Sequence, residues 1–127
     1  MNALLPEEII IGIIGTGGFK EFTADTSALH RDVFRLKQLD DYKEILKPFR
    51  FAGSPAAPFS RVLDMALFNL QFRNLLRKYN PDLIVYNVPE DTKSYYKKHV
   101  KPKLDDSNLT ELFKTMAASF MERQNVH

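Results

Sequence analysis

The chain has 127 residues, of which 44% are hydrophobic and 27% charged, with seven prolines and five glycines, so it has the composition of one folded domain rather than of a disordered chain. It contains no cysteine, which excludes disulfide bonds and thiolate metal sites and leads us to expect a cytoplasmic location. The formal charge of +2 is too small to indicate nucleic-acid binding by itself, and the apolar run at 9–14 falls far short of the roughly 20 residues that span a membrane, so we expect no membrane anchor.

The first element is predicted to be a helix from Pro6 to about Ile14. Proline is tolerated at the first helical position, and acidic side chains such as those of Glu7 and Glu8 favour the positive end of the helix dipole. The glycines that follow at 15–18 are expected to end this helix.

The same residues allow a second interpretation, a strand followed by the glycine-rich turn of a dinucleotide-binding fold. In that motif the third glycine lets the next helix pack closely on the strand, but Lys20 occupies its position here. Such a fold also needs several further parallel strands, and only 83–88 is a convincing one. We therefore favour the helix, and we expect no nucleotide site.

Two helices and a loop are predicted next. The second helix is expected to start at a cap within 23–26 and to bury an apolar stripe from Leu29 to Leu36. A short third helix is expected at about 40–46. Residues 47–58 contain three prolines and a Gly-Ser pair, which predicts a loop.

Residues 58–88 carry the clearest structural signal. Ser60 can cap a helix that runs to about Lys78, and Asn80-Pro81-Asp82 supplies turn chemistry before an apolar strand at 83–88. This order of helix, turn and strand is typical of a winged helix.

Two more helices are predicted after the strand. The first, from Glu90 to about Lys101, is polar and is expected to end at Pro102. The second, at about 106–124, is the most regularly amphipathic segment, with one apolar face formed by Leu109, Leu112, Phe113, Met116, Ala117 and Phe120. The whole chain is therefore predicted to be one domain, mainly α with a small β wing.

A family resemblance supports this interpretation. The pattern Phe59-Ser60-x-x-Leu63-x-x-Ala66-Leu67-x-x-Leu70-x-x-x-x-Leu75-Leu76, followed by Tyr86-x-Val88, resembles winged helix-turn-helix domains. Its Pro-Phe-Ser opening is also faintly similar to Panacea (SocA-like antitoxin) domains. The resemblance covers about residues 25–100, and it implies a DNA-binding regulator or, as an antitoxin would be, a protein-interaction module.

Candidate DNA contacts follow from the winged-helix interpretation. The helix before a wing usually enters the major groove, and basic side chains near its end and on the wing hold phosphates. We expect bases to be contacted by Arg61, Asn69 and Gln71. We expect phosphates to be contacted by Arg73, Arg77, Lys78, Lys93, Lys97, Lys98 and Lys101.

The alternative is a winged-helix module that binds another protein and no DNA. A helical projection places Phe68 and Phe72 on a flank of the 60–78 helix, where apolar rings and the acidic Asp64 suit a phosphate-lined groove poorly. We expect the DNA-binding protein to be a homodimer through the 106–124 helix. In the alternative, a protein partner is contacted by Phe68, Phe72, Leu109, Phe113, Met116 and Phe120.

No residue pattern predicts an enzyme, a cofactor, a metal site or a small-molecule ligand. His30, His99 and His127 are far apart and lack metal-ligand spacing. The aspartate pairs at 40–41 and 105–106 stand at predicted helix starts, where carboxylates cap backbone amides.

Overall fold

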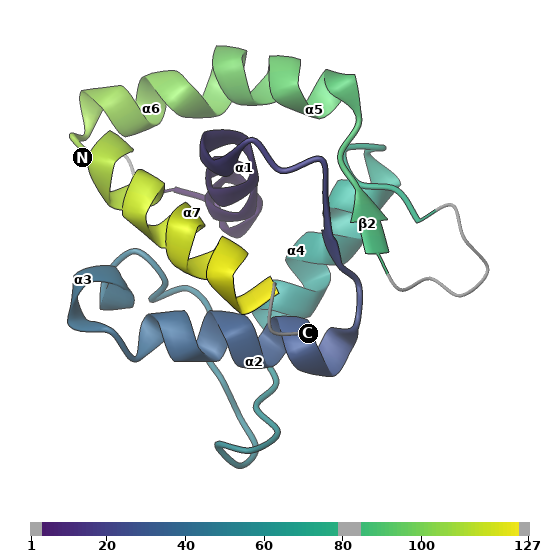
Figure 1. Cartoon of the computed structure of the whole chain (residues 1–127), viewed down its shortest axis with the longest axis vertical. Coiled ribbons are helices and arrows are strands. Elements are labelled where there is room, and N and C mark those ends of the chain that lie inside the picture. Colours follow the sequence, from purple (N-terminus) through teal and green to yellow (C-terminus); the bar gives the residue numbers. More distant parts are fainter. Residues whose placement is uncertain (1–3, 79–84, 125–127) are drawn as a thin grey trace.

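The computed structural model is mainly helical, with one small antiparallel sheet, and it describes residues 4–78 and 85–124 (Figure 1). The prediction of a mainly α protein with a small β element is confirmed. The described elements are α1 (Pro6–Gly17), β1 (Glu21–Thr23), α2 (Thr26–Lys37), α3 (Asp40–Lys43), α4 (Arg61–Phe72), β2 (Val85–Asn87), α5 (Glu90–Tyr95), the π-helix η1 (Tyr96–Val100), α6 (Lys101–Asp106) and α7 (Thr110–Gln124).

Helix α1 lies at the centre of the molecule. Figure 1 shows it with α5 and α6 on one side, α2 on the opposite side, and α7 and α4 between them. Its five isoleucines, at 9, 10, 11, 13 and 14, are all buried, as expected for a helix that is apolar all round. The dinucleotide interpretation is wrong, because these residues form a helix that ends where Gly18 adopts a left-handed conformation with φ of 66°.

The glycines of α1 allow other elements to approach it closely. A Cβ atom at Gly12 would lie 2.7 Å from Cε2 of Phe113 on α7, and one at Gly15 would lie 2.3 Å from Cγ of Tyr96 on η1. Both distances are too short for any larger residue without movement of the partner ring. These glycines therefore serve helix packing, not phosphate binding.

The sheet joins segments that are distant in the sequence. Strand β1 pairs antiparallel with β2, with Phe22 opposite Tyr86. Arg77 also pairs with Asn87, since the Arg77 N–H donates to the Asn87 carbonyl (3.1 Å) and the Asn87 N–H donates to the Arg77 carbonyl (2.7 Å). Of the predicted strand at 83–88, the first two residues, like the predicted turn at 80–82, lie outside the described residues.

Helix α4 starts as predicted and ends earlier. The Ser60 hydroxyl accepts a hydrogen bond from the Leu63 N–H at 3.2 Å, which confirms the cap. The helix stops at Phe72 instead of near Lys78, because Asn74 takes a left-handed conformation with φ of 60°.

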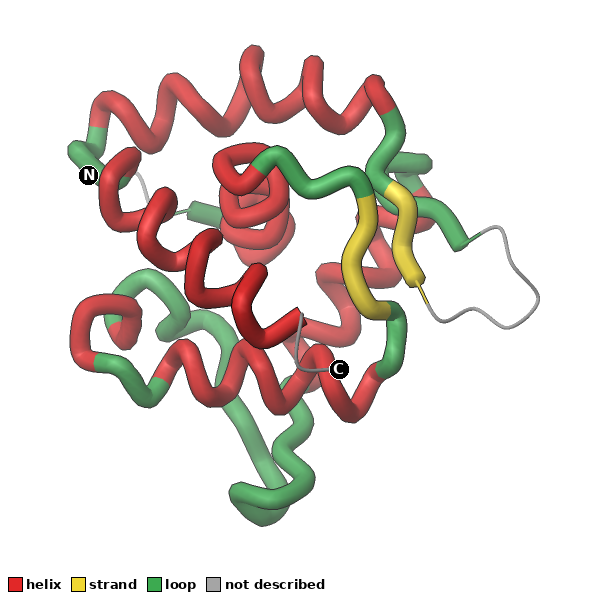
Figure 2. Tube along the Cα trace, in the orientation of Figure 1, coloured by secondary structure: helices red, strands yellow, loops and turns green. Residues whose placement is uncertain are grey.

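Helices α5, η1 and α6 form one continuous helical segment across one side of the molecule (Figure 2). Its buried residues are spaced by four: Thr92, Tyr96, Val100 and Leu104. In an α-helix, residues four apart rotate by about 40° around the axis, so such a row would wind away from α1 within three turns. The wider π turn, in which the Lys101 N–H donates to the Tyr96 carbonyl, removes this drift and keeps the row facing α1.

The predicted helix end at Pro102 is therefore wrong. Pro102 stands within the first turn of α6, directly after the π turn. A proline lacks the N–H that an α-helix needs at this point, and its ring would clash with the preceding turn. The wider turn relieves both problems, and the segment continues to Asp106.

Helix α7 closes the core. Phe113, Met116 and Phe120 are between 0% and 4% exposed, and α7 packs along α1. Leu109 is half-buried and packs on the same core. These four residues were predicted to contact a partner. That prediction is corrected, because their side chains pack in the core of the chain itself.

Candidate functional site

The polar side chains predicted to contact bases are held by other parts of the fold. The Asn69 amide donates to Oε1 of Glu7 at 3.2 Å. The Gln71 amide donates to the Leu67 carbonyl at 3.3 Å and to the Tyr86 hydroxyl at 3.4 Å. Both side chains are half-buried, so the described structure leaves only Arg61 of this set exposed.

The outward face of α4 is apolar instead. Met65, Phe68 and Phe72 recur every three or four residues and are 49%, 58% and 80% exposed. The rings of Phe68 and Phe72 stack with centroids 6.4 Å apart. We call these three residues the α4 stripe. Contiguous exposed apolar side chains of this size are typical of protein-interaction sites.

A shallow hollow of about 450 Å³ lies beside the α4 stripe. It runs between the start of α1 and the first two turns of α4, and its lining includes Leu5, which is 61% exposed, and Met65 of the stripe. Glu7, Arg61 and Asn69 supply its polar lining. The exposed apolar surface therefore consists of the α4 stripe and a groove along one side of it.

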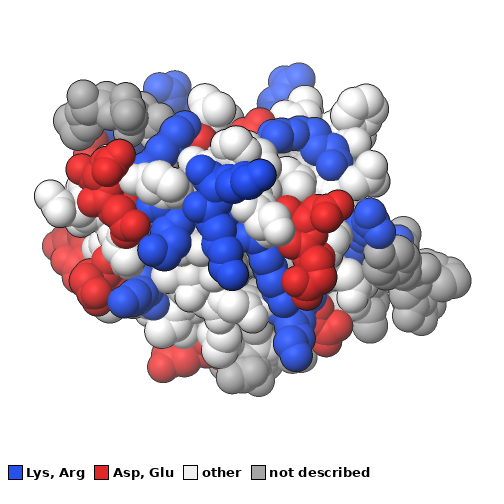
Figure 3. Space-filling view, turned by 90° about the horizontal axis from the view of Figure 1, so that it is seen from above, with Lys and Arg blue, Asp and Glu red and all other residues white. Residues whose placement is uncertain are grey.

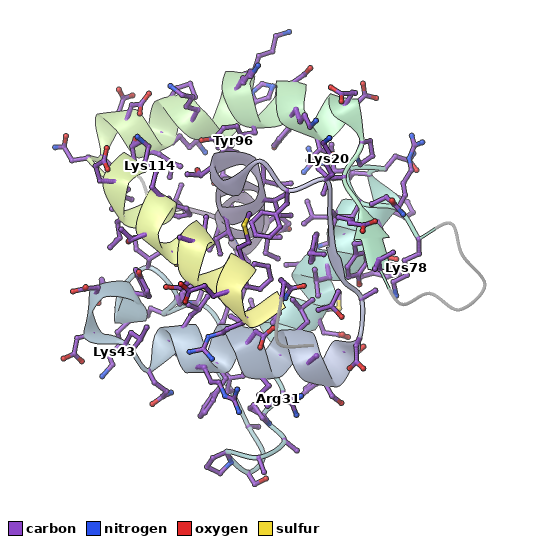
Figure 4. The ribbon with its side chains drawn as sticks, viewed as in Figure 1. Lys20, Arg31, Lys43, Lys78, Tyr96 and Lys114 are labelled. Atoms are coloured by element: carbon purple, nitrogen blue, oxygen red, sulfur yellow. The ribbon has the colours of Figure 1, made fainter. Side chains whose placement is uncertain are left out.

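The basic residues at the end of α4 rest on aromatic rings. The Arg73 guanidinium lies 5.1 Å from the ring centre of Tyr95, and the Lys78 ammonium lies 4.9 Å from that of Tyr86. Figure 4 labels Lys78. Burial, and to a smaller extent the charge of Asp64, raises the pKa of Tyr86 to about 12. Arg77 is half-buried beside β2.

The other predicted phosphate contacts lie together on α5, η1 and α6. We call Lys93, Lys97, Lys98 and Lys101 the basic face. Figure 3 looks onto this side and shows Lys and Arg side chains across its middle, with acidic side chains towards both ends. Arg73 reaches this segment through Tyr95, whereas Arg61 lies at the opposite end of α4.

His30 forms a buried polar site that the sequence did not predict. It is 0% exposed, its Nδ1 accepts a hydrogen bond from the Ser60 N–H at 3.0 Å, and its ring stacks on Phe59 with centroids 4.6 Å apart. Its Nε2 lies 3.8 Å from Oδ1 of Asp64, which is half-exposed. His30 therefore links α2 to the cap of α4, and its spacing from Ser60 gives no local signal of this contact.

This site makes stability dependent on pH. Burial lowers the pKa of His30 below its usual 6.5, and Asp64 offsets this only in part. Because the unfolded chain binds the proton more tightly, the free energy of unfolding should fall as pH drops from about 6.5 towards the lower folded-state pKa. The slope for one proton is at most about 1.4 kcal/mol per pH unit. Urea unfolding between pH 7.5 and 5 should show a steeper loss for the native chain than for His30→Gln, and equal slopes would contradict this role.

Two further features are absent from the part of the chain that the structure describes. No three His, Asp or Glu side chains of residues 4–78 and 85–124 gather where they could hold a metal ion. Within the same ranges, no helix has the length and apolarity to cross a membrane.

The candidate functional surfaces of the described structure are therefore the α4 stripe, which exposes apolar side chains, and the basic face, which gathers lysines. Comparison with known proteins adds no family to this description. No protein-family model, curated protein sequence or solved structure matches the chain.

Proposed function

We propose that this protein is a protein-interaction module with a winged-helix-like scaffold, and that the α4 stripe docks an amphipathic helix of another protein. The observation that carries the proposal is the exposure of Met65, Phe68 and Phe72 on one side of a single helix. A partner helix would lay its apolar face along this stripe and into the hollow beside it, which is a common mode of peptide recognition.

The chain order supports a winged-helix scaffold. A helix, a short strand and two helices (α1 to α3) precede α4, and the chain after α4 pairs with β2 through Arg77. Strand β2 pairs in turn with β1, which stands between the first two helices. In this scheme α4 takes the place of the recognition helix, and α5 to α7 are additions that enclose α1.

Base reading by α4 is the less favoured function. Asn69 and Gln71 would have to leave their present partners to reach a base edge. The stripe would meanwhile place two phenylalanine rings where the major groove presents polar base edges between phosphates. We therefore favour the protein-interaction alternative over duplex DNA.

The charges around the stripe indicate which partner fits. Arg73 at the C-cap makes one end of the stripe positive, whereas at the other end the charge of Arg61 is balanced by that of Asp64 in the first turn of α4. A partner helix with an acidic residue beside the apolar position that meets Phe72 would complement Arg73. A second copy would place Arg73 against Arg73 in a parallel arrangement and against the Arg61 and Asp64 end, which has no net charge, in an antiparallel one. We therefore propose a different protein, not a homodimer.

Photo-crosslinking in cells that produce the protein tests this proposal. A benzoylphenylalanine at position 72 should crosslink to a segment that mass spectrometry identifies as amphipathic and acidic. The same probe at Met121, an apolar residue on α7 that is 41% exposed, is the matched control. Phe68→Asp should reduce the crosslink from position 72 at least about tenfold, as expected for an apolar anchor at the centre of an interface.

The result is informative only if the variant folds. Phe68 is 58% exposed, so Phe68→Asp should keep the native helical circular dichroism and unfold cooperatively. Crosslinks from position 72 to a second copy, or crosslinks that survive Phe68→Asp, would overturn the proposed partner.

A further inference from the structure

We propose that the basic face, together with Tyr95 and His99, binds single-stranded nucleic acid without reading its sequence. The lysines would contact phosphates, and the exposed ring of His99 would stack on a base. This site is separate from the α4 stripe and does not depend on the function proposed for it.

The π turn arranges the lysines for this purpose. Lys93, Lys97 and Lys101 each follow by one residue a member of the buried row Thr92, Tyr96 and Val100. The π turn that keeps the buried row straight therefore keeps these lysines in a straight row as well. Successive lysines are about one helical turn, roughly 5 Å, apart along the segment. Such a row can follow a phosphate backbone.

The ammonium groups are available to phosphates. Lys97 and Lys98 are exposed and form no ion pair with any residue in the described ranges. Lys93 pairs with Glu90 (3.1 Å) and Lys101 with Asp105 (3.4 Å), both on the surface and within the same helical segment. Exposed pairs of this kind are weak, so both lysines can exchange them for phosphates.

Aromatic rings lie along the other edge of the same segment. On one edge, Lys93 and Lys97 border a pocket that also contacts the turn after α1. On the other edge, the rings of Tyr95 and His99 lie 4.8 Å apart, and the Arg73 guanidinium lies 5.1 Å from the ring centre of Tyr95. His99 is exposed. A strand lying along the segment would thus meet ammonium groups on one side and the ring of His99 on the other, the combination typical of sites for single strands.

The length and shape of the face favour a single strand over a duplex. Glu90 and Asp91 stand at one end of the lysine row, and Asp105 and Asp106 at the other, so the track covers only a few nucleotides. In a duplex the bases are stacked inside and cannot reach His99, whereas a single strand can turn its bases outward.

Fluorescence anisotropy with a labelled oligothymidylate of twelve nucleotides tests this inference, with a duplex of the same length as comparison. At 50 mM salt the full chain should bind the single strand more tightly than the duplex. Log Kd should rise with log salt with a slope of about 2 to 3, since each of three to four phosphate contacts contributes roughly 0.7.

Two double variants test whether binding depends on the basic face in particular or only on the net charge of the protein. Lys97→Glu with Lys98→Glu should weaken binding of the single strand at least about tenfold. The control, Lys43→Glu with Lys47→Glu, changes the net charge equally at α3 and just after it, away from the basic face, and should weaken binding less than about threefold (Figure 4).

A third variant tests the stacking. His99→Ala should weaken binding roughly fivefold or more without changing the salt slope. Absence of binding at 50 mM salt, equal affinity for the duplex, an equal loss in the Lys43 and Lys47 control or no effect of His99→Ala would each overturn the inference. Phe68→Asp should leave this binding unchanged, so a failure here is distinct from a failure of the proposed protein docking.

Discussion

Replacing Phe113 by alanine is expected to lower the free energy of unfolding by about 3 to 5 kcal/mol, because the change removes a large ring from the core and leaves a cavity. Phe113 is 0% exposed, and its ring lies against Gly12 of α1. The same replacement at Phe72, which is 80% exposed, should change the free energy of unfolding by less than about 1 kcal/mol. The two variants carry an identical chemical change, so burial alone distinguishes them.

Urea unfolding followed by circular dichroism measures both variants. The comparison also separates the two faces that were first expected to bind partners. A cost of less than about 1 kcal/mol at Phe113 would mean that α7 is not a core helix. Conversely, a cost near that of Phe113→Ala at Phe72 would show that the stripe is covered within the folded chain.

Gly15→Ala is expected to destabilise the protein by about 2 to 3 kcal/mol, although alanine is normally the better helix former by roughly 1 kcal/mol. The added methyl group would lie 2.3 Å from Cγ and 2.4 Å from Cδ1 of Tyr96. Tyr96 cannot simply swing away, because its hydroxyl shares a hydrogen bond with the Thr16 hydroxyl at 2.9 Å. The α5–η1–α6 segment would have to move away from α1.

Gly18→Ala serves as the matched control for this effect. Nothing lies within 4 Å of a methyl group there, so only the left-handed backbone with φ of 66° opposes alanine, at a cost of about 1 to 2 kcal/mol. A double-mutant cycle identifies the contact: if the cost at Gly15 arises from Tyr96, Gly15→Ala combined with Tyr96→Ala should cost less than the sum of the two single changes. Strict additivity, or a stabilising effect of Gly15→Ala, would exclude the clash.

The parts of the fold that local chemistry specifies were predictable. Ser60 caps α4 as expected, and Asp25, within the predicted range of 23–26, caps α2. A short polar side chain before an apolar stripe satisfies free backbone amides wherever the helix lies. The pairing of β1 with β2 was not predictable. Strand β1 has only three residues, too few for an alternating pattern, and its partner is more than 60 positions away in the sequence.

In the candidate site too, features set by the local sequence were predictable and contacts with distant residues were not. A helical projection of residues 60–78 already placed Phe68 and Phe72 outside the core, and the structure exposes both. The projection could not show that Asn69 and Gln71 are engaged, since their partners Glu7 and Tyr86 are 62 and 15 residues away. The burial of α7 could not be predicted either, because the sequence pattern of an amphipathic helix is the same whether its apolar face packs on its own core or on another molecule.

The central position of α1 has a consequence for how the chain folds during synthesis. Helix α1 is made early, but its cover comes from α4, η1 and α7, and Phe113 follows Gly12 by about 100 residues. At the usual 5 to 20 residues per second, a highly apolar helix waits roughly 5 to 20 seconds for its main partner. Folding of the core therefore cannot be completed until α7 has left the ribosome, and the side of α1 that α7 covers stays open until then.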